Sequence, residues 1–292
     1  MTLNPLFWII YGLLYLISLV PFWLLYLLSD GVFYFLYYVI GYRKQVVRDN
    51  LRRSFPNKTE QEQLEIEKTY FRFLSDNLLE SVKLLSMRKK SIQKRFSLKN
   101  PELITQFTDK DQSILLAMSH YANWEWAAPG LTSALNVKTI IVYKPLTNTS
   151  VEKIINGIRS QYGAIMVPMK QTIRTILEHQ GETTMSILVS DQTPSARDNM
   201  HFVDFLNQPT AVFQGLEKIA KLTKSPVVYM NVVRVKRGYY EAVFTLLEDK
   251  PLSTADNEIT EKYNKELENI ILADPAYWLW SHKRWKHQPK HS

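Results

Sequence analysis

A histidine and a glutamate lie five residues apart in the segment His120-Tyr-Ala-Asn-Trp-Glu125. The segment follows a short apolar run, residues 113–118, that has the composition of a buried strand. Asn123 is a preferred residue for starting a helix, so we expect a helix from Trp124 to Leu135 with Glu125 in its first turn. A histidine beside a carboxylate can remove a proton from an alcohol. The segment therefore predicts a general base at the exit of a strand, where α/β sheets place their sites.

The geometry of this pair depends on a turn between its two members. On one regular helix, positions five apart point about 140° apart, because each residue turns the helix by about 100°. If His120 lies in the turn before the helix, its ring can fold back on Glu125. The carboxylate would then hold one ring nitrogen and leave the other facing substrate, as the aspartate of a Ser-His-Asp triad does. The alternative is a surface histidine beside an unrelated first-turn glutamate.

The chain begins with an apolar segment. Residues 1–29 contain no charged side chain, and Leu6 to Leu28 is almost wholly large apolar and aromatic residues. A helix of that length rises about 34 Å, enough to cross a hydrocarbon core of about 30 Å. Pro21 would kink it, and a second apolar run, Val32 to Ile40, follows. We expect one kinked spanning helix or a spanning helix followed by an interfacial one, the remaining alternative being a buried helix of a soluble protein.

Basic residues follow the apolar segment at once: Arg43, Lys44, Arg48, Arg52 and Arg53. Positive charge beside a spanning segment marks the cytoplasmic side and attracts anionic headgroups. We therefore expect residues 1–41 to form a membrane anchor of transmembrane or interfacial helices. Residues 42–292 would form a cytoplasmic domain lying against anionic inner-leaflet lipids.

The overall charge is consistent with an acidic partner. Lys plus Arg number 36 and Asp plus Glu 28, giving a net charge of +8. Such a balance suits an anionic bilayer, an acidic protein or a phosphorylated substrate, whereas the sequence contains no nucleic-acid-binding motif. The absence of cysteine excludes disulfides, zinc–thiolate sites and a cysteine nucleophile. Without a glycine-rich nucleotide motif, we expect no cofactor and no metal.

Strand-like and helical segments alternate through the rest of the chain. An amphipathic helix is expected from Thr59 to Val82, opened by the capping box Thr59-x-x-Glu62. The strand-like runs are residues 113–118, 138–143, 164–167, 184–189 and 227–235. This alternation predicts an α/β fold.

Several motifs, taken in order, resemble those of the bacterial lipid A late acyltransferases, which share a His-x4-Asp/Glu element with the wider glycerolipid acyltransferases. They are the apolar amino terminus, Asn50-Leu-Arg-Arg-Ser-Phe-Pro56, the segment from His120 to Glu125, Tyr143-Lys144-Pro145, Arg159, Asp191-Gln192, Phe205-Leu-Asn-Gln-Pro-Thr210 and Tyr277 to Trp285. Asn207 stands where the family usually has glycine, and asparagine tolerates the left-handed backbone of such a turn.

The resemblance implies a mixed sheet flanked by helices and an acyltransferase of the bacterial inner membrane. An acyl chain would pass from acyl carrier protein, or acyl-CoA, to a hydroxyl of a lipid A precursor or related membrane glycolipid. The alternatives are an acyltransferase for a different membrane lipid, an acyl-thioester hydrolase, and a lipid-binding protein without catalysis.

The resemblance also assigns roles to residues. His120 is the general base and Glu125 its orienting partner, and no covalent intermediate is required because a thioester is already activated. Arg159, on a helix expected over residues 151–162, would contact a phosphate or a developing oxyanion. The remaining substrate contacts would be Asp191 and Gln192, which follow the strand at 184–189, together with Asn123 and Lys144.

The carboxy-terminal segment mixes tryptophans with basic residues. Trp278 and Trp280 suit a lipid surface and equally a last element of the core. Three basic residues, Lys283, Arg284 and Lys286, form a candidate docking site for an acidic carrier protein.

Overall fold

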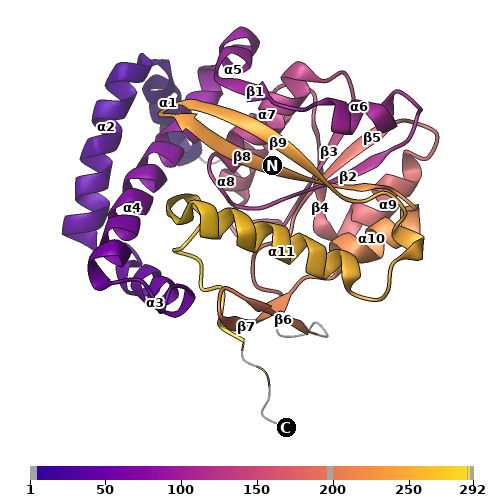
Figure 1. Ribbon diagram of the computed structural model, residues 1–292. Coiled ribbons are helices and arrows are strands. Elements are labelled where there is room, and N and C mark those ends of the chain that lie inside the picture. The colour runs from indigo at the N-terminus through magenta and orange to yellow at the C-terminus, as the bar shows by residue number, and fades with distance from the viewer. Residues whose placement is uncertain (1–4, 196–199, 288, 290–292) are drawn as a thin grey trace.

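A mixed sheet forms the centre of the molecule. The computed structural model describes residues 5–195, 200–287 and 289, and in this part of the chain the main sheet has seven strands (Figure 1). In order across the sheet they are β1 (Phe96–Leu98), β9 (Tyr239–Glu248), β8 (Val227–Lys236), β2 (Ile114–Met118), β5 (Thr184–Val189), β3 (Lys138–Tyr143) and β4 (Ile165–Pro168). The strands from β8 to β4 are parallel, whereas β9 runs antiparallel to β8 and parallel to β1. The expected α/β fold with a mixed sheet is confirmed.

The five expected strands are all present, and two of them, β3 and β5, have the predicted bounds. Four further strands were not predicted from the sequence: β1, β9, and the pair β6 (His201–Phe205) and β7 (Gln208–Val212), which form a separate hairpin. Asn207 has a left-handed backbone with φ of 61° in the turn of this hairpin, as expected.

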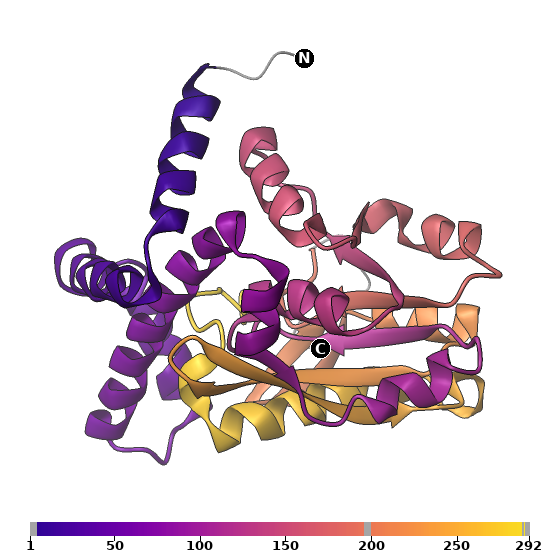
Figure 2. The ribbon, with the colours of Figure 1, turned by 90° about the horizontal axis from the view of Figure 1, so that it is seen from above.

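Helices flank the sheet on both sides. Helix α11 (Glu258–Ala273) covers one face, and α8 (Thr149–Ser160) projects from the opposite side (Figure 2). The other helices of the domain are α3 (Lys44–Ser54), α5 (Lys89–Arg95), α6 (Glu102–Thr108), α7 (Trp124–Ala134), α9 (Thr172–Glu178) and α10 (Gly215–Thr223). Helix α4 (Glu60–Lys83) begins as predicted, because Thr59 and Glu62 form both hydrogen bonds of the capping box.

The apolar amino terminus forms two helices, so the expectation of one helix over Leu6–Leu28 is wrong. Helix α1 (Pro5–Leu19) ends before Pro21, and α2 (Phe22–Tyr34) begins after it and continues into a π-helical turn, Phe35–Ile40. Proline lacks the amide hydrogen that would continue the helix. In the described part of the chain, Phe22–Ile40 is the one segment long and apolar enough to cross a membrane, and Phe7–Leu19 is a shorter apolar helix.

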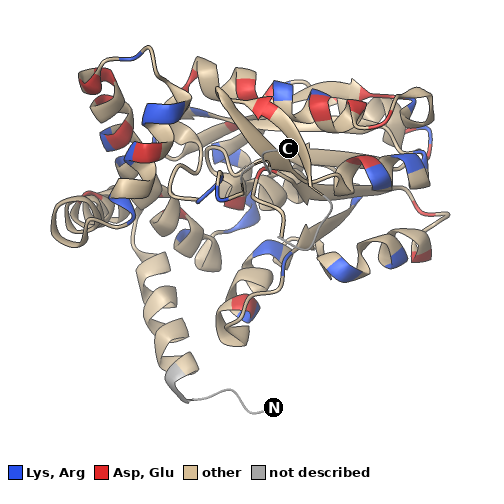
Figure 3. Cartoon of the chain, turned by 90° about the horizontal axis from the view of Figure 1, so that it is seen from below, with Lys and Arg blue, Asp and Glu red and all other residues tan. Residues whose placement is uncertain are grey.

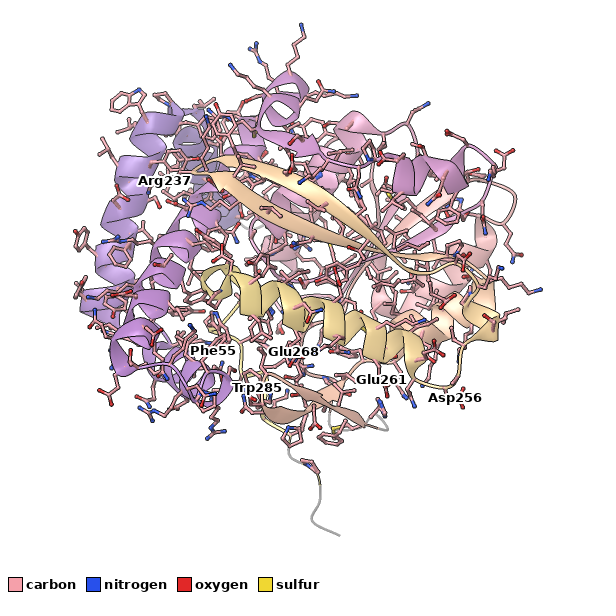
Figure 4. The ribbon with its side chains drawn as sticks, viewed as in Figure 1. Phe55, Arg237, Asp256, Glu261, Glu268 and Trp285 are labelled. Carbon is pink, nitrogen blue, oxygen red and sulfur yellow. The ribbon has the colours of Figure 1, made fainter. Side chains whose placement is uncertain are left out.

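Helix α2 and the π-helical turn that follows it are held against α4 by a row of hydroxyl–carboxylate hydrogen bonds. Tyr26 donates to Glu80 at 2.9 Å, Ser29 to Asp76 at 2.6 Å and Tyr37 to Glu67 at 2.8 Å. Arg237, labelled in Figure 4, lies at the turn between β8 and β9 and donates to both Asp30 and Asp76. Helix α2 is therefore part of the folded body, although its outer face is apolar. Helix α1 instead extends away from the body (Figure 2).

Candidate active site

The pairing of β2 with β5 brings His120 next to Asp191. Met118 and Val189 are register partners at the carboxyl ends of these parallel strands, and each functional side chain lies two residues further on. The Nδ1 atom of His120 is 2.7 Å from Oδ1 of Asp191, and the backbone amide of His120 donates to Oδ2 at 3.0 Å. The carboxylate therefore fixes both the ring and the backbone of the histidine.

A third donor completes the environment of Asp191. The indole nitrogen of Trp278 donates to Oδ2 at 2.9 Å, and the carboxylate is 2% exposed. Burial by itself would raise the pKa of Asp191, but the charge and hydrogen bonds of His120 and the indole lower it below its usual value. Asp191 is therefore an ionised acceptor at neutral pH, and His120 carries its proton on Nδ1.

The second nitrogen of His120 faces the open side of the site. Gln192 places its amide nitrogen 3.3 Å from Nε2 of His120, and the ring packs edge-on against Trp124 with the centroids 5.3 Å apart. The His120 side chain is 20% exposed. With Nδ1 donating to Asp191, Nε2 is an acceptor, and in this structure it accepts from the Gln192 amide, whose place a substrate hydroxyl would take. This is the arrangement of a general base.

Glu125 does not orient His120, so that prediction is wrong. Its two oxygens accept from Arg159 in a bidentate pair, Nε to Oε2 at 2.9 Å and Nη2 to Oε1 at 2.7 Å, and Trp124 donates to Oε1 at 3.1 Å. Burial alone would raise the pKa of Glu125, but Arg159 lowers it below its usual value. The first turn of α7 directs the carboxylate toward α8 rather than back to the turn. The predicted contact of Arg159 with phosphate or oxyanion is therefore replaced, in this structure, by an ion pair.

Two further residues were predicted to contact substrate: Asn123, which is buried, and Lys144, which is exposed. Asn123 is 0% exposed, because its Oδ1 accepts from the amide of Trp126 at 3.0 Å and its Nδ2 donates to Glu80 at 2.7 Å. It starts α7 as expected, and both ends of its side-chain amide are bound by protein groups, so its contact with substrate stays a prediction. Lys144 lies in the exposed loop after β3, where its contact with substrate stays a prediction.

The carboxy-terminal segment is part of the buried core and contacts the active-site turn. Trp278 forms a bridge with Tyr121, and the indole of Trp285, labelled in Figure 4, donates to Thr210 at 2.7 Å. Arg284 is 2% exposed and donates to the carbonyl of Ala211 at 2.6 Å. Its predicted role in docking a carrier protein is therefore wrong. Lys283 and Lys286 are exposed.

An apolar cavity of about 410 Å³ opens beside the pair of Glu125 and Arg159. Glu125 and Trp124 form one wall. Most of its aliphatic lining comes from the π-helical turn, α4 and α8, namely Leu36, Leu74, Leu78, Ile155 and Ile158, and Leu279 completes it. The cavity has the chemistry of a site for a hydrocarbon chain.

A buried carboxylate connects the active-site turn to the amino-terminal helices. Glu80 is 0% exposed and accepts from Tyr240 at 2.6 Å, from Asn123 at 2.7 Å and from Tyr26 at 2.9 Å. Burial raises its pKa from 4.5 to about 7. Glu80 therefore joins α2, α4 and β9 to the residue that starts α7.

The raised pKa of Glu80 predicts a pH-dependent stability. Between pH 4.5 and 7 the folded state binds this proton more tightly than the unfolded state, so stability falls as pH rises through that range. The loss amounts to about 3 kcal/mol. In Glu80→Gln the amide oxygen can still accept from Asn123 and Tyr240, so we expect a folded variant that lacks this loss. The measurement is the apparent Tm in detergent from pH 5 to 8.

An exposed glutamate, Glu102, supplies the matched control. Glu102→Gln should keep the pH dependence of the unchanged chain, whereas Glu80→Gln should flatten it. Parallel pH curves for all three proteins would show that Glu80 is not the titrating group.

Comparison with known proteins identifies the family of this chain. The family model of the bacterial lipid A biosynthesis acyltransferases matches residues 1–287. A lipid A biosynthesis acyltransferase of Haemophilus influenzae is 26% identical over 286 residues, covering 95% of this chain and 87% of the relative. A lipid A biosynthesis palmitoleoyltransferase of Escherichia coli is 20% identical over 290 residues, covering 98% and 94%. The chain belongs to the bacterial lipid A biosynthesis acyltransferase family and is an O-acyltransferase.

Proposed function

We propose that this chain moves a fatty acyl chain from acyl carrier protein, or from acyl-CoA, to a hydroxyl of a lipid A precursor, with His120 as the general base. The observation that carries the proposal is the 2.7 Å contact between Nδ1 of His120 and Asp191 at the ends of two paired strands. It leaves Nε2 as a proton acceptor on the open side of the site.

The reaction follows from these positions. Nε2 of His120 takes the hydroxyl proton while the acceptor oxygen attacks the thioester carbonyl carbon. Asp191 stabilises the imidazolium that forms. The tetrahedral intermediate then expels the thiol sulfur, which receives the proton back from Nε2, so the ester forms as the thioester bond breaks. The amide of Gln192, 3.3 Å from Nε2, is the proposed donor to the oxyanion.

Two neighbouring features would bind the substrates. The apolar cavity lined by Leu74, Leu78, Ile155 and Ile158 would hold an acyl chain, because each buried methylene contributes about 0.8 kcal/mol. Arg159 would meet a phosphate of the acceptor, which would compete with Glu125 for the guanidinium. Both roles fit the chemistry of the side chains present.

We propose that residues 1–41 anchor the chain at the inner membrane and that the domain of residues 42–292 lies on its cytoplasmic side. Helix α1 carries no charged residue, and Ile9, Leu13 and Leu16 on it are exposed. The polar inner face of α2 is bound to α4, so α2 would lie in the interface with its apolar side toward lipid.

Only part of the basic segment from Arg43 to Arg53 is available to contact lipid. Arg43 donates to the carbonyl of Ser281 and Arg48 pairs with Glu67. Arg52 and Arg53 on α3 are exposed. These two would contact anionic inner-leaflet lipids.

An assay with two labelled donors tests the proposed reaction. The full chain in proteoliposomes with a lipid A precursor receives radiolabelled acyl carrier protein thioester or acyl-CoA. We expect label in the lipid, and a steeper fall of kcat/KM with salt for the carrier-linked donor, because Lys283 and Lys286 would steer an acidic protein. Free fatty acid as the main product would indicate a hydrolase, and no product with either donor would contradict the proposal. If kcat/KM fell equally with salt for both donors, Lys283 and Lys286 would not be the docking site of a carrier protein.

A further inference from the structure

A short segment on the catalytic body exposes an apolar stripe. It consists of a 3₁₀ turn, Met169–Gln171, and helix α9. Met169, Ile173 and Leu177 are 46%, 45% and 40% exposed, and their spacing of four places them on one helical face. The buried face is a different one, formed by Thr172 and Ile176. The stripe is therefore not the side of α9 that packs on the body.

Basic side chains lie next to this stripe. Arg174 follows Ile173 on α9 and so lies about 100° further around the helix, and Lys170 follows Met169 in the 3₁₀ turn. The side chain of Arg174 is 82% exposed and pairs with Glu178 at 2.7 Å. An apolar stripe bordered by lysine and arginine is typical of a helix that lies in the interface of an anionic bilayer.

The position of α9 agrees with a bilayer contact. In Figure 2, α1, α8 and α9 lie on the same side of the sheet, with α8 between the other two. In Figure 3, which views the molecule from the direction opposite to that of Figure 2, α1 carries no acidic or basic residue. Leu146, in the loop before α8, and Val151, in the first turn of α8, are also exposed. The exposed apolar residues of α9 and of the α8 region therefore lie on the same side of the sheet as α1, the proposed membrane anchor.

A cavity between α1 and α8 strengthens this arrangement. It measures about 460 Å³ and is lined by Phe7, Trp8 and Tyr11 of α1 and by Ile154 and Ile158 of α8. Ile158 also lines the cavity beside Glu125. Helix α8 therefore separates a groove on the side of the anchor from the apolar cavity of the active site.

We propose that the face of Met169, Ile173 and Leu177 is a second membrane contact, docked on an anionic bilayer with Lys170 and Arg174 at the phosphates. This inference rests on the proposed anchoring by α1. A contact at α9, added to those of α1 and α2 in the amino-terminal anchor, fixes the rotation of the body on the membrane. Because α8 lies between them, the bilayer faces the helix that lines the active-site cavity, and a lipid substrate reaches it without leaving the membrane.

The cysteine-free sequence allows a direct test with single labels. Ile173→Cys in the full chain is labelled with an environment-sensitive fluorophore and reconstituted in vesicles of phosphatidylethanolamine and phosphatidylglycerol, with or without brominated acyl chains. Leu13→Cys on α1 reports the anchor. Leu252→Cys is the matched control, because Leu252 is 61% exposed in the turn Pro251–Ser253, which follows β9 and belongs to none of α1, α8 and α9.

We expect brominated lipid to quench the labels at Leu13 and Ile173 by twofold or more and to leave the label at Leu252 unchanged. Adding Lys170→Glu and Arg174→Glu should reduce quenching at Ile173 only. Quenching at Leu13 without quenching at Ile173 would overturn the second contact and leave the anchor intact, whereas no quenching at either would refute the anchor as well. A blue-shifted label at Ile173 that depends on protein density and not on brominated lipid would indicate a second copy of the chain, and would also overturn the inference.

Discussion

His120→Ala should lower kcat/KM for acyl transfer by about 10³-fold or more, because it removes the proposed proton acceptor. The acceptor alcohol would then have to lose its proton to water as it attacks. The backbone amide of His120 donates to Asp191 independently of the side chain, so the turn should keep its conformation. The measurement is the initial rate of label transfer to lipid in proteoliposomes, alongside the apparent Tm of the variant.

A surface histidine provides the control for this substitution. His179 lies near Lys138 and Glu182, outside the active site, and His179→Ala should retain full activity. Near-normal turnover of His120→Ala with an unchanged Tm would refute the assignment of the base. A lowered Tm together with lost activity would call for His120→Gln, which keeps more of the packing against Trp124.

The strands that could be predicted with correct bounds are those that form an uninterrupted apolar run in the sequence. β3 and β5 are buried parallel strands, which have uninterrupted apolar runs that are visible in the sequence. β9 was not predicted because it alternates buried with partly exposed residues and contains Glu241 within its apolar pattern. In the amino terminus, composition indicates a long apolar segment but not where its helices end. The division into α1 and α2 follows from Pro21, which lacks the amide hydrogen needed to continue a helix.

One member of the proposed catalytic pair, His120, could be predicted from the sequence, whereas the other, Asp191, depended on strand pairing. His120 was found from its place after an apolar run, and its partner was sought nearby in Glu125. The actual partner, Asp191, is 71 positions away and becomes a neighbour only because β2 pairs with β5. The available signal was that both residues follow strands of parallel type, whose carboxyl ends meet at one edge of the sheet.

Arg284 illustrates a limit of reasoning from charge. Three basic residues near the end of a chain suggest a solvated tail, yet Arg284 lies among buried aromatic side chains, with its guanidinium 6.0 Å from the ring centre of Phe205. Burial lowers its pKa to about 10. Its hydrogen bond to a backbone carbonyl of β7 stabilises it there, and no local sequence pattern indicates such a long-range partner.

Asp191→Asn should lower kcat by about 10²- to 10⁴-fold with little change in KM. The asparagine amide would donate to Nδ1 of His120, which would place the ring proton on Nε2 and remove the lone pair needed for catalysis.

Glu125→Gln should affect substrate binding and stability instead, because it leaves the largely buried Arg159 without its ionic partner. Steady-state kinetics on both variants, with the apparent Tm, distinguish these effects.

Two further substitutions sharpen the comparison. Trp278→Phe removes one of the hydrogen bonds to Asp191 while keeping an aromatic ring in place, so its loss of kcat should be smaller than that of Asp191→Asn. Asp204→Asn, at an exposed position of β6, should be silent. If Glu125→Gln lost more kcat than Asp191→Asn at unchanged KM, Glu125 rather than Asp191 would be the group that orients the base. The ion pair with Arg159 would then have to open during turnover, because in the present geometry both oxygens of Glu125 are occupied by the guanidinium.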